Sequence, residues 1–445
     1  MTLIYKVTDK PKFPQVLIFA FQQLLAILAA TIAVPSIIGN GMSQSAALFG
    51  AGIGTIVYLF FTRFKSPVFL GSSFAFLGSM FAAFAGAVSE AAGHAGLIVG
   101  AIFAGLVYVI IAIIVKFAGV NWINKLMPPV VIGPTVSIIG LSLASNAVGD
   151  TLRGSYSAAA GAYVMTGGVW AGFVCAITTL ITIIVCSVYG KKMTKLIPFI
   201  IGILVGYIVA TIFTLIGTST GNEALKIINF AAFENVKWIP DFTFLKAANG
   251  LKEIDGKYLL TLAVAYVPVA FVVFAEHIAD HKNLSSIINQ DLLESPGLHR
   301  TLLGDGIGSV TGSLFGGCPN TTYGESVGCV AITGNASVIT ILTTAILAIA
   351  VSFFGPFVTF LSTIPTCVMG GVCITLYGFI AVSGLKMIQA VDLNQNKNLF
   401  VVSVILICGI GGMSLQIGKV TLTSIACALI MGIIVNTVVS KKADE

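Results

Sequence analysis

Three carboxylic acids lie within apolar stretches of the sequence, where a charge is costly and by default indicates function. Glu276 and Asp280 are four residues apart, and Glu325 follows a polar segment further along the chain. Residues four apart share one face of a helix, so two carboxylates at this spacing repel and one of them is expected to hold a proton near neutral pH. Proton coupling requires a carboxyl group that gains and loses a proton. The pair therefore predicts proton coupling through Glu276 and Asp280.

The position of this pair along its apolar span allows a second interpretation. Residues 258–275 already form a mostly apolar segment, equivalent to about 27 Å of helix. Glu276 and Asp280 could then mark the cytoplasmic end of the span, unless Pro268 interrupts the helix and lets the span begin further out. Hydropathy alone supports both placements.

Two histidines beside these acids raise a metal-dependent alternative, an intramembrane metal hydrolase. His277 and His281 have the four-residue spacing of zinc-binding helices, but their order does not match His-Glu-x-x-His. No other His or Cys lies in a polar setting, so neither a metal site nor a cofactor is predicted. The histidines are assigned to a loop end near the headgroups, and Asp305, in a glycine-rich turn, to a structural or helix-starting role.

The elements that carry these residues indicate a membrane protein. Hydrophobic residues make up 57% of the 445-residue chain, charged residues 9%, and the mean hydropathy is +1.02, far from the values of soluble domains. Apolar blocks of about 20 residues match about 30 Å of hydrocarbon. The pattern predicts an all-α polytopic fold with fourteen transmembrane segments. They are residues 15–36, 46–61, 68–87, 95–115, 126–147, 163–188 and 196–217, then 258–280, 301–317, 321–334, 336–355, 365–388, 399–416 and 420–440.

Lysine and arginine gather on one side of these segments. With a cytoplasmic N-terminus, most of the 23 basic residues fall in cytoplasmic segments, and most of the others lie in the long connection 218–257, where the positive-inside rule is weak. Both termini are predicted to be cytoplasmic, and the first apolar run is expected to be a retained helix. The net charge of +6 follows from this bias, so nucleic acid is not expected as a partner.

Three pieces of the first half recur in the same order in the second half, which indicates a duplication. The pairs are 48–55 with 302–309, 72–76 with 321–325, and 127–133 with 364–370. With seven segments per copy, the second copy must lie upside down in the membrane. Inverted repeats are typical of alternating-access carriers, whose sites form near the midplane between broken helices. The predicted units are a first repeat at 1–217, an extracellular connection at 218–257 and a second repeat at 258–445.

The third segment of each repeat is the predicted broken helix. Ser72-Ser73-Phe74 and Thr321-Thr322-Tyr323 are polar or β-favouring residues beside glycines. Backbone outside a helix is tolerated at membrane depth only where it is buried in protein or lines a cavity. A short extended stretch followed by a helix start would leave N–H groups aimed at a ligand. The alternative is that both segments are tight loops at the membrane surface.

Four motifs give the chain a resemblance to a known family. They are Leu70-Gly71-Ser72-Ser73-Phe74-Ala75-Phe76, Ala275-Glu276-His277, Pro296-Gly297-Leu298-His299-Arg300 and Pro319-Asn320-Thr321-Thr322-Tyr323-Gly324-Glu325. On these motifs the chain resembles the nucleobase–ascorbate transporter (nucleobase:cation symporter-2) family over nearly its whole length, and within it the bacterial uracil permease branch. The resemblance implies a transporter, not an enzyme, that forms a homodimer in the lipid of the inner membrane. It also implies a core domain, about 15–115 and 258–355, against a gate domain, about 126–217 and 365–440.

The resemblance also assigns a substrate site. Carried over by position, Glu276 and Glu325 look like the substrate carboxylates, Phe74 and Gly324 the backbone donors, and Ala30 and Tyr323 the pocket walls. Uracil presents two ring N–H donors and two carbonyl acceptors, which suit carboxylates and backbone amides respectively. The expected activity is proton-coupled symport of uracil into the cell by alternating access, with sodium coupling less favoured.

Three positions depart from the family pattern. Gln23 stands where many members have His, Ser326 where Asn is common, and Asp280 where the best-known uracil permeases have His. Asp280 is similar to the purine-carrying branch, which keeps a xanthine or uric acid symporter as the alternative. Glu325 is similar to the uracil branch, because purine carriers usually have Gln there, and it would face the ring directly. Glu325 therefore favours uracil.

Overall fold

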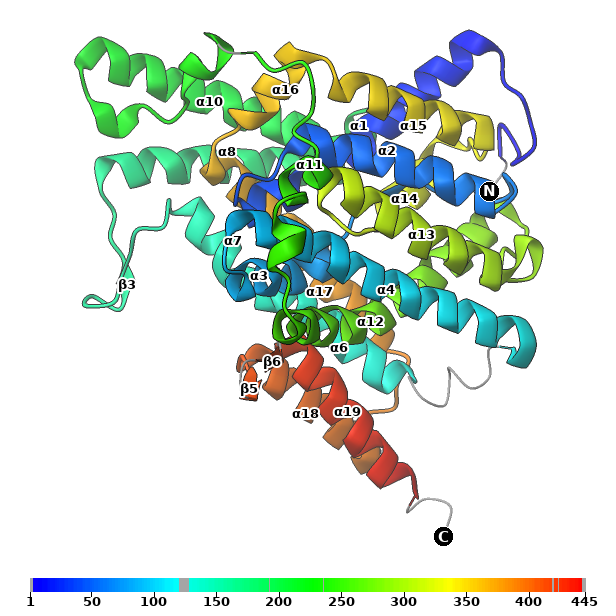
Figure 1. The fold of residues 1–445 in the computed structure, drawn as a ribbon. Helices are drawn as coiled ribbons and strands as arrows, with labels where there is room; N and C mark the ends of the chain where they lie inside the picture. The colour runs from blue at the N-terminus through cyan, green and yellow to red at the C-terminus, as the bar shows by residue number, and fades with distance from the viewer. Residues whose placement is uncertain are drawn as a thin grey trace.

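The computed structural model describes residues 3–119, 128–191, 193–234, 236–417, 420–422 and 424–441, and this part is mostly helical (Figure 1). Within it, eight helical spans are long and apolar enough to cross a membrane. They are α1 (Phe13–Ile38), α2 (Gln44–Phe61), α4 (Glu90–Ala118), α6 with α7 (Pro129–Ser142 and Ala144–Thr151), α8 (Gly167–Tyr189), α10 (Pro198–Thr220), α12 (Gly256–Ile288) and α17 (Thr366–Ile388). The chain is therefore an integral, multi-pass membrane protein.

The remaining helices are shorter or more polar. They are α3 (Leu77–Gly86), α9 (Met193–Leu196), α11 (Thr243–Ala247), α13 (Leu298–Gly316), α14 (Gly324–Thr333), α15 (Val338–Ser352), α16 (Gly355–Ser362), α18 (Asn396–Ile410) and α19 (Ser424–Lys441). In the chain, the short η1 (Phe74–Phe76) directly precedes α3, and η5 (Leu293–Gly297) directly precedes α13. A bend of 82° separates α15 from α16, and counting this pair as one span brings the total in the described part to nine. Residues 126–127, where the fifth predicted segment and the third repeat match begin, and residue 423 in the last segment lie outside the described residues.

The helix α12 does not end near Glu276 and Asp280. It begins at Asp255, whose carboxylate accepts a hydrogen bond of 2.7 Å from the Tyr258 backbone N–H, and continues to Ile288 with Pro268 inside it. The expectation that Pro268 interrupts the span is therefore wrong, and the helix continues past Asp280 to Ile288. Both acids lie in the interior of a 33-residue helix.

The predicted extended stretches are present as two buried strands. β1 (Leu70–Ser72) pairs antiparallel with β4 (Asn320–Thr322), with Gly71 opposite Thr321. Every residue of both strands is buried, so the alternative of surface loops is wrong. Pairing satisfies the backbone groups that a helix would otherwise satisfy, which allows extended chain inside the protein. Two further hairpins, β2 (Tyr156–Ser157) with β3 (Ala162–Tyr163) and β5 (Leu415–Ile417) with β6 (Val420–Leu422), form separate two-stranded sheets.

Glycines bring α2 and α13 into close contact beside the strands (Figure 1). These two helices carry the first pair of repeat matches. A Cβ atom on Gly50 of α2 would lie 2.5 Å from the Gly312 carbonyl oxygen of α13. The Asn320 side chain of β4 donates a 3.0 Å hydrogen bond to the Gly50 carbonyl. Small residues let the two backbones approach closely, and this contact supports the strand crossing.

The connection between α10 and α12 packs on the ends of several helices. It contains η2 (Glu223–Leu225), η3 (Phe230–Glu234), α11 and η4 (Gly250–Glu253). Its Phe242 ring lies 4.9 Å from the Phe49 ring of α2 and 5.7 Å from the Phe315 ring of α13. The Thr214 hydroxyl of α10 accepts hydrogen bonds of 3.1 Å from the backbone N–H groups of Ile227 and Ile228. The connection is therefore a packed layer rather than a loose loop.

Candidate functional site

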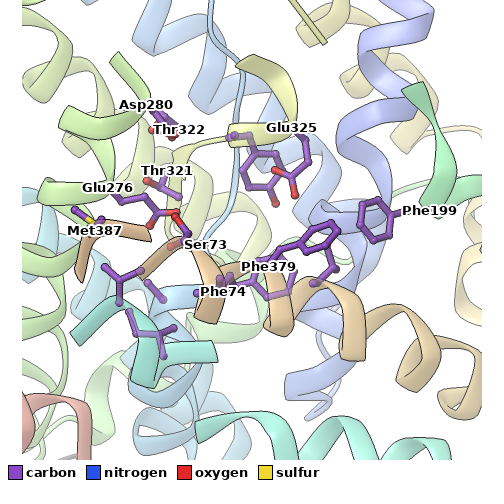
Figure 2. A pocket seen from close by; sticks show the side chains of 18 residues that line it. Ser73, Phe74, Phe199, Glu276, Asp280, Thr321, Thr322, Glu325, Phe379 and Met387 are labelled. Carbon is purple, nitrogen blue, oxygen red and sulfur yellow. Dashed lines mark hydrogen bonds between the residues drawn. The ribbon is translucent and has the colours of Figure 1, made fainter. Parts of the chain in front are cut away.

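A cavity of about 390 Å³ lies at the strand crossing, a volume typical of small-molecule sites. One wall of the cavity consists of β4, α12 and the two helix starts that follow β1 and β4. The other wall consists of α6, α10 and α17. The polar lining residues are Ser383 and, labelled in Figure 2, Ser73, Glu276, Asp280, Thr321, Thr322 and Glu325. The remaining lining is mostly apolar and aromatic, so the few polar groups determine what the cavity can bind.

The three predicted carboxylates reach this one cavity from two helices. Glu276 and Asp280 project from α12, and Glu325 lies in the first turn of α14 (Figure 2). The Thr322 hydroxyl donates a 2.7 Å hydrogen bond to Asp280 Oδ2 and so fixes this carboxyl group against β4. Carboxylates are hydrogen-bond acceptors when ionised, so the cavity suits a ligand with N–H groups.

Two helix starts supply backbone N–H groups, hydrogen-bond donors that complement the carboxylate acceptors. Phe74 and Ala75 begin η1, Gly324 begins α14, and all three line the cavity. Neither helix start has a side-chain cap, which leaves its first N–H groups for a ligand. The Tyr323 hydroxyl donates a 2.8 Å hydrogen bond to the Ser72 carbonyl. This bond holds the start of α14 against β1.

The structure brings together five of the six predicted substrate residues. Glu276, Glu325, Phe74, Tyr323 and Gly324 all line the cavity. Ala30 does not: it is buried within α1 and is absent from the lining. The assignment of Ala30 as a pocket wall therefore differs from the structure. The proton-coupling candidates Asp280 and Glu276 are both lining residues.

Sequence reasoning missed the wall that α10 and α17 contribute. Phe199 comes from α10, and α17 contributes Leu376, Phe379, Ile380, Ser383 and Met387. The α17 residues follow the three- and four-residue spacing of a single helix face. In a helix that is apolar all round, however, this spacing does not stand out from residues that face lipid. Ser73 and Thr321 were also missed as individual site residues, although their segments were predicted to be broken helices.

The two histidines are structural groups inside the protein. His277 and His281 are fully buried and stack with ring centroids 4.0 Å apart. His277 Nδ1 lies 2.6 Å from Asp305 Oδ2, and its Nε2 lies 3.0 Å from the Thr301 hydroxyl. Their assignment to a loop end near the headgroups is wrong. Asp305 lies in the middle of α13, so its assignment to a turn or helix start is also wrong, while its buried contact with His277 agrees with the structural role.

Hydrogen bonds also occupy both ring nitrogens of His281. Nδ1 donates to the His277 carbonyl at 2.8 Å, and Nε2 lies 2.7 Å from the Tyr58 hydroxyl. All four imidazole nitrogens of the pair therefore have protein partners, which leaves none directed at a metal. In the described part of the chain, no three His, Cys, Asp or Glu side chains are arranged to hold a metal ion. These contacts give no support to the metal hydrolase alternative.

Two of the residues that depart from the family pattern bond to each other. Gln23 Nε2 lies 2.5 Å from the Ser326 hydroxyl oxygen, which also accepts a 3.0 Å hydrogen bond from the Phe69 backbone N–H. Both side chains are buried between α1 and α14, and neither lines the cavity. The pair therefore fixes α14 against α1 and the entry to β1.

Comparisons with known proteins show the family of the chain. A family model described as "Permease family" matches residues 14–418. The chain is 39% identical to "Uracil permease" of Bacillus caldolyticus, over 98% of this chain and 94% of that protein. It is 37% identical to "Uracil permease" of Bacillus subtilis (strain 168), over 96% and 93%, and 34% identical to "Uracil permease" of Escherichia coli (strain K12), over 96% and 92%.

Solved structures share the fold at low sequence identity. The transmembrane domain of a cyanobacterium bicarbonate transporter, BicA, superposes with a TM-score of 0.61 at 15% identity, over 96% of this chain and 98% of that one. The murine anion transporter Slc26a9 in the inward-facing state gives 0.66 at 11% identity, over 98% and 70%. The family model and these relatives place the chain in the nucleobase–ascorbate transporter family of permeases, as a membrane transporter and not an enzyme.

Proposed function

We propose that this protein carries uracil into the cell in symport with protons, by alternating access. The observation that carries the proposal is that Glu276 and Glu325, both from the second half of the chain, line one cavity together with two uncapped helix starts, one from each half. Carboxylates can accept from the two N–H groups of uracil, and backbone N–H groups can donate to its carbonyl oxygens. The relatives named uracil permease support the same substrate.

The proposed architecture has fourteen segments in two inverted repeats, 1–217 and 258–445, joined by the extracellular connection 218–257. Support comes from the antiparallel pairing of β1 with β4 and from the packing of α2 on α13, since each pair consists of matching pieces of the two repeats. Residues 15–115 and 258–355 would form the core domain, and 126–217 and 365–440 the gate domain. The cavity then lies between core and gate. A homodimer in the inner membrane, in contact with lipid, completes the proposal.

The cavity is proposed to open toward the cytoplasm. It is lined by Phe199, at the beginning of α10, and by Ser383 and Met387, near the end of α17. Lys195 and Lys386 lie at these same ends, and the positive-inside rule places such residues on the cytoplasmic side. Both termini are proposed to lie on this side as well. The structure then corresponds to the state that releases substrate into the cell.

Uptake by purified protein in proteoliposomes tests the function directly. With an acidic exterior we expect labelled uracil to accumulate, because protons moving inward carry the substrate with them, and we expect a sodium gradient alone to have no effect. Excess xanthine should not compete. Liposomes without protein, and proteoliposomes treated with a protonophore, provide the controls. Uracil accumulation driven by a sodium gradient would show that sodium, not protons, is the coupling ion. Strong competition by xanthine would favour the purine symporter.

Asp280→Asn is expected to uncouple transport from the proton gradient. The amide oxygen can still accept the Thr322 hydroxyl, so the local structure and uracil binding should change by less than about three-fold, a cost of under 1 kcal/mol. The side chain can no longer exchange a proton, so acid-driven accumulation should fall at least ten-fold while uracil exchange at equal pH persists. Thr322→Val is the matched control, because it removes the hydrogen bond but keeps the carboxyl group. Wild-type accumulation by Asp280→Asn would exclude this residue from coupling.

A further inference from the structure

Two buried hydroxyl groups in the cavity are without a partner in the described part of the chain. Ser73 Oγ and Thr321 Oγ1 make no hydrogen bond there, although their residues are only 1% and 3% exposed. Both residues line the cavity. Buried polar side chains are nearly always paired, so an unpaired pair facing one cavity needs an explanation.

Backbone pairing fixes the position of both hydroxyls. Thr321 lies in β4 opposite Gly71 of β1, and Ser73, which follows β1, donates its backbone N–H to the Pro319 carbonyl at 2.9 Å. Each side chain can therefore adjust only by rotation about χ1. Figure 2 shows both residues beside Glu276, with Glu325 on another side of the cavity. One hydroxyl comes from each half of the chain, whereas both glutamates belong to the second half.

The neighbourhood of Glu276 has acceptors but needs donors. Around a uracil ring the N–H and C=O groups alternate, so a carboxylate that accepts from a ring N–H lies next to a carbonyl oxygen. An ionised carboxylate cannot donate to that oxygen, whereas a serine or threonine hydroxyl can. The Thr322 hydroxyl is already committed to Asp280. Ser73 and Thr321 are the hydroxyls that remain on this side of the cavity.

We propose that Ser73 and Thr321 form a hydroxyl pair that donates hydrogen bonds to the ring carbonyl of the nucleobase next to the N–H group bound by Glu276. This inference rests on the proposed function and adds two specificity-determining residues to the site. The pair distinguishes a ring with an acceptor at this position from a ring without one, because the buried hydroxyls stay unpaired when the acceptor is missing. The helix-start N–H groups then serve the second carbonyl.

Removal of each hydroxyl tests the proposal. Ser73→Ala and Thr321→Val, which keeps a β-branched side chain in the strand, should each weaken uracil affinity about five- to ten-fold, the usual effect of one lost hydrogen bond. Ser72→Ala is the matched control: Ser72 is a buried serine in β1, next to Ser73, that does not line the cavity. Its affinity should stay within about two-fold of the wild-type value. Thr321→Ser, which keeps the hydroxyl group, should bind uracil with wild-type affinity.

Thio analogues separate a contact with the ring from a general loss of structure. Sulfur is a weak acceptor, so the wild type should prefer uracil over 2-thiouracil or 4-thiouracil, whichever carries sulfur at the contacted position. This preference should shrink toward equality in Ser73→Ala and Thr321→Val and persist in Ser72→Ala. Undiminished preference over both analogues in the two variants would overturn the proposal. If Thr321→Val does not fold, the comparison of Ser73→Ala with its Ser72→Ala control decides whether the hydroxyls contact the ring. If the wild type does not bind uracil, the proposed function fails instead.

Discussion

Glu276→Gln and Glu325→Gln are expected to reduce uracil binding by about 100-fold or more, since truncating one partner of a buried charged hydrogen bond costs 2–5 kcal/mol. Glutamine presents an NH2 group where the ring N–H needs an acceptor, so each substitution both removes an attraction and introduces an unpaired donor. The fold should persist, because both side chains project into a cavity and glutamine has nearly the same size. Calorimetric titration with uracil measures binding, and the thermal unfolding midpoint of the purified protein measures the fold.

The exposed carboxylate of Glu294, outside the cavity in η5, supplies the matched control. Glu294→Gln makes the same chemical change and should leave uracil binding at its wild-type value. The prediction for the two cavity residues is the same although they come from different helices, α12 and α14. Wild-type binding by Glu325→Gln would refute the site, and loss of binding together with a large fall in the unfolding midpoint would show a structural role.

Gly50→Ala should be the most damaging small substitution away from the cavity. Its new methyl group would lie 2.5 Å from the Gly312 carbonyl oxygen and 3.1 Å from the Gly316 nitrogen, both of them backbone atoms of α13 that cannot rotate aside. Forcing extra volume into a packed contact costs about 1–3 kcal/mol. The helices must separate, which also weakens the Asn320 hydrogen bond that supports β4. We expect a lower unfolding midpoint and weaker uracil binding together.

Gly378→Ala in α17 is the control for this substitution. Nothing lies within 4 Å of the position its methyl group would occupy. Alanine is a better helix former than glycine by about 0.5–1 kcal/mol, so this variant should be as stable as the wild type or more stable. Equal unfolding midpoints for Gly50→Ala and Gly378→Ala would contradict the close contact between α2 and α13.

The site was predictable where the sequence departs from an apolar background. Glu276, Asp280 and Glu325 are carboxylates in apolar surroundings, and Ser72-Ser73 and Thr321-Thr322 are poor transmembrane helix residues, so single-residue properties identify them. The antiparallel pairing of β1 with β4 is the pairing expected if the second copy lies upside down relative to the first. Conversely, the α17 wall could not be separated from lipid-facing residues, because hydropathy gives Leu376 and Phe379 the same character on either side of a helix.

The errors come from partners that are distant in the sequence. Hydropathy assigns His277 and His281 a cost of burial, and so favours a loop end. Asp305 and Thr301 contribute hydrogen bonds to one ring and Tyr58 to the other, which offset that cost. Pro268 was expected to interrupt α12, but surrounding helices hold the helix continuous through it. In each case tertiary contacts reverse a preference that is correct for the isolated segment.

The strand crossing has a consequence for biosynthesis. Leu70 pairs with Thr322, so about 250 residues must leave the ribosome after the first strand before its partner exists. Until then the backbone of residues 70–72 has polar groups that hydrocarbon cannot satisfy. The first strand can therefore complete its hydrogen bonds only after Asn320–Thr322 have been synthesised, and a chain cut short before Asn320 would lack both this pairing and one wall of the cavity.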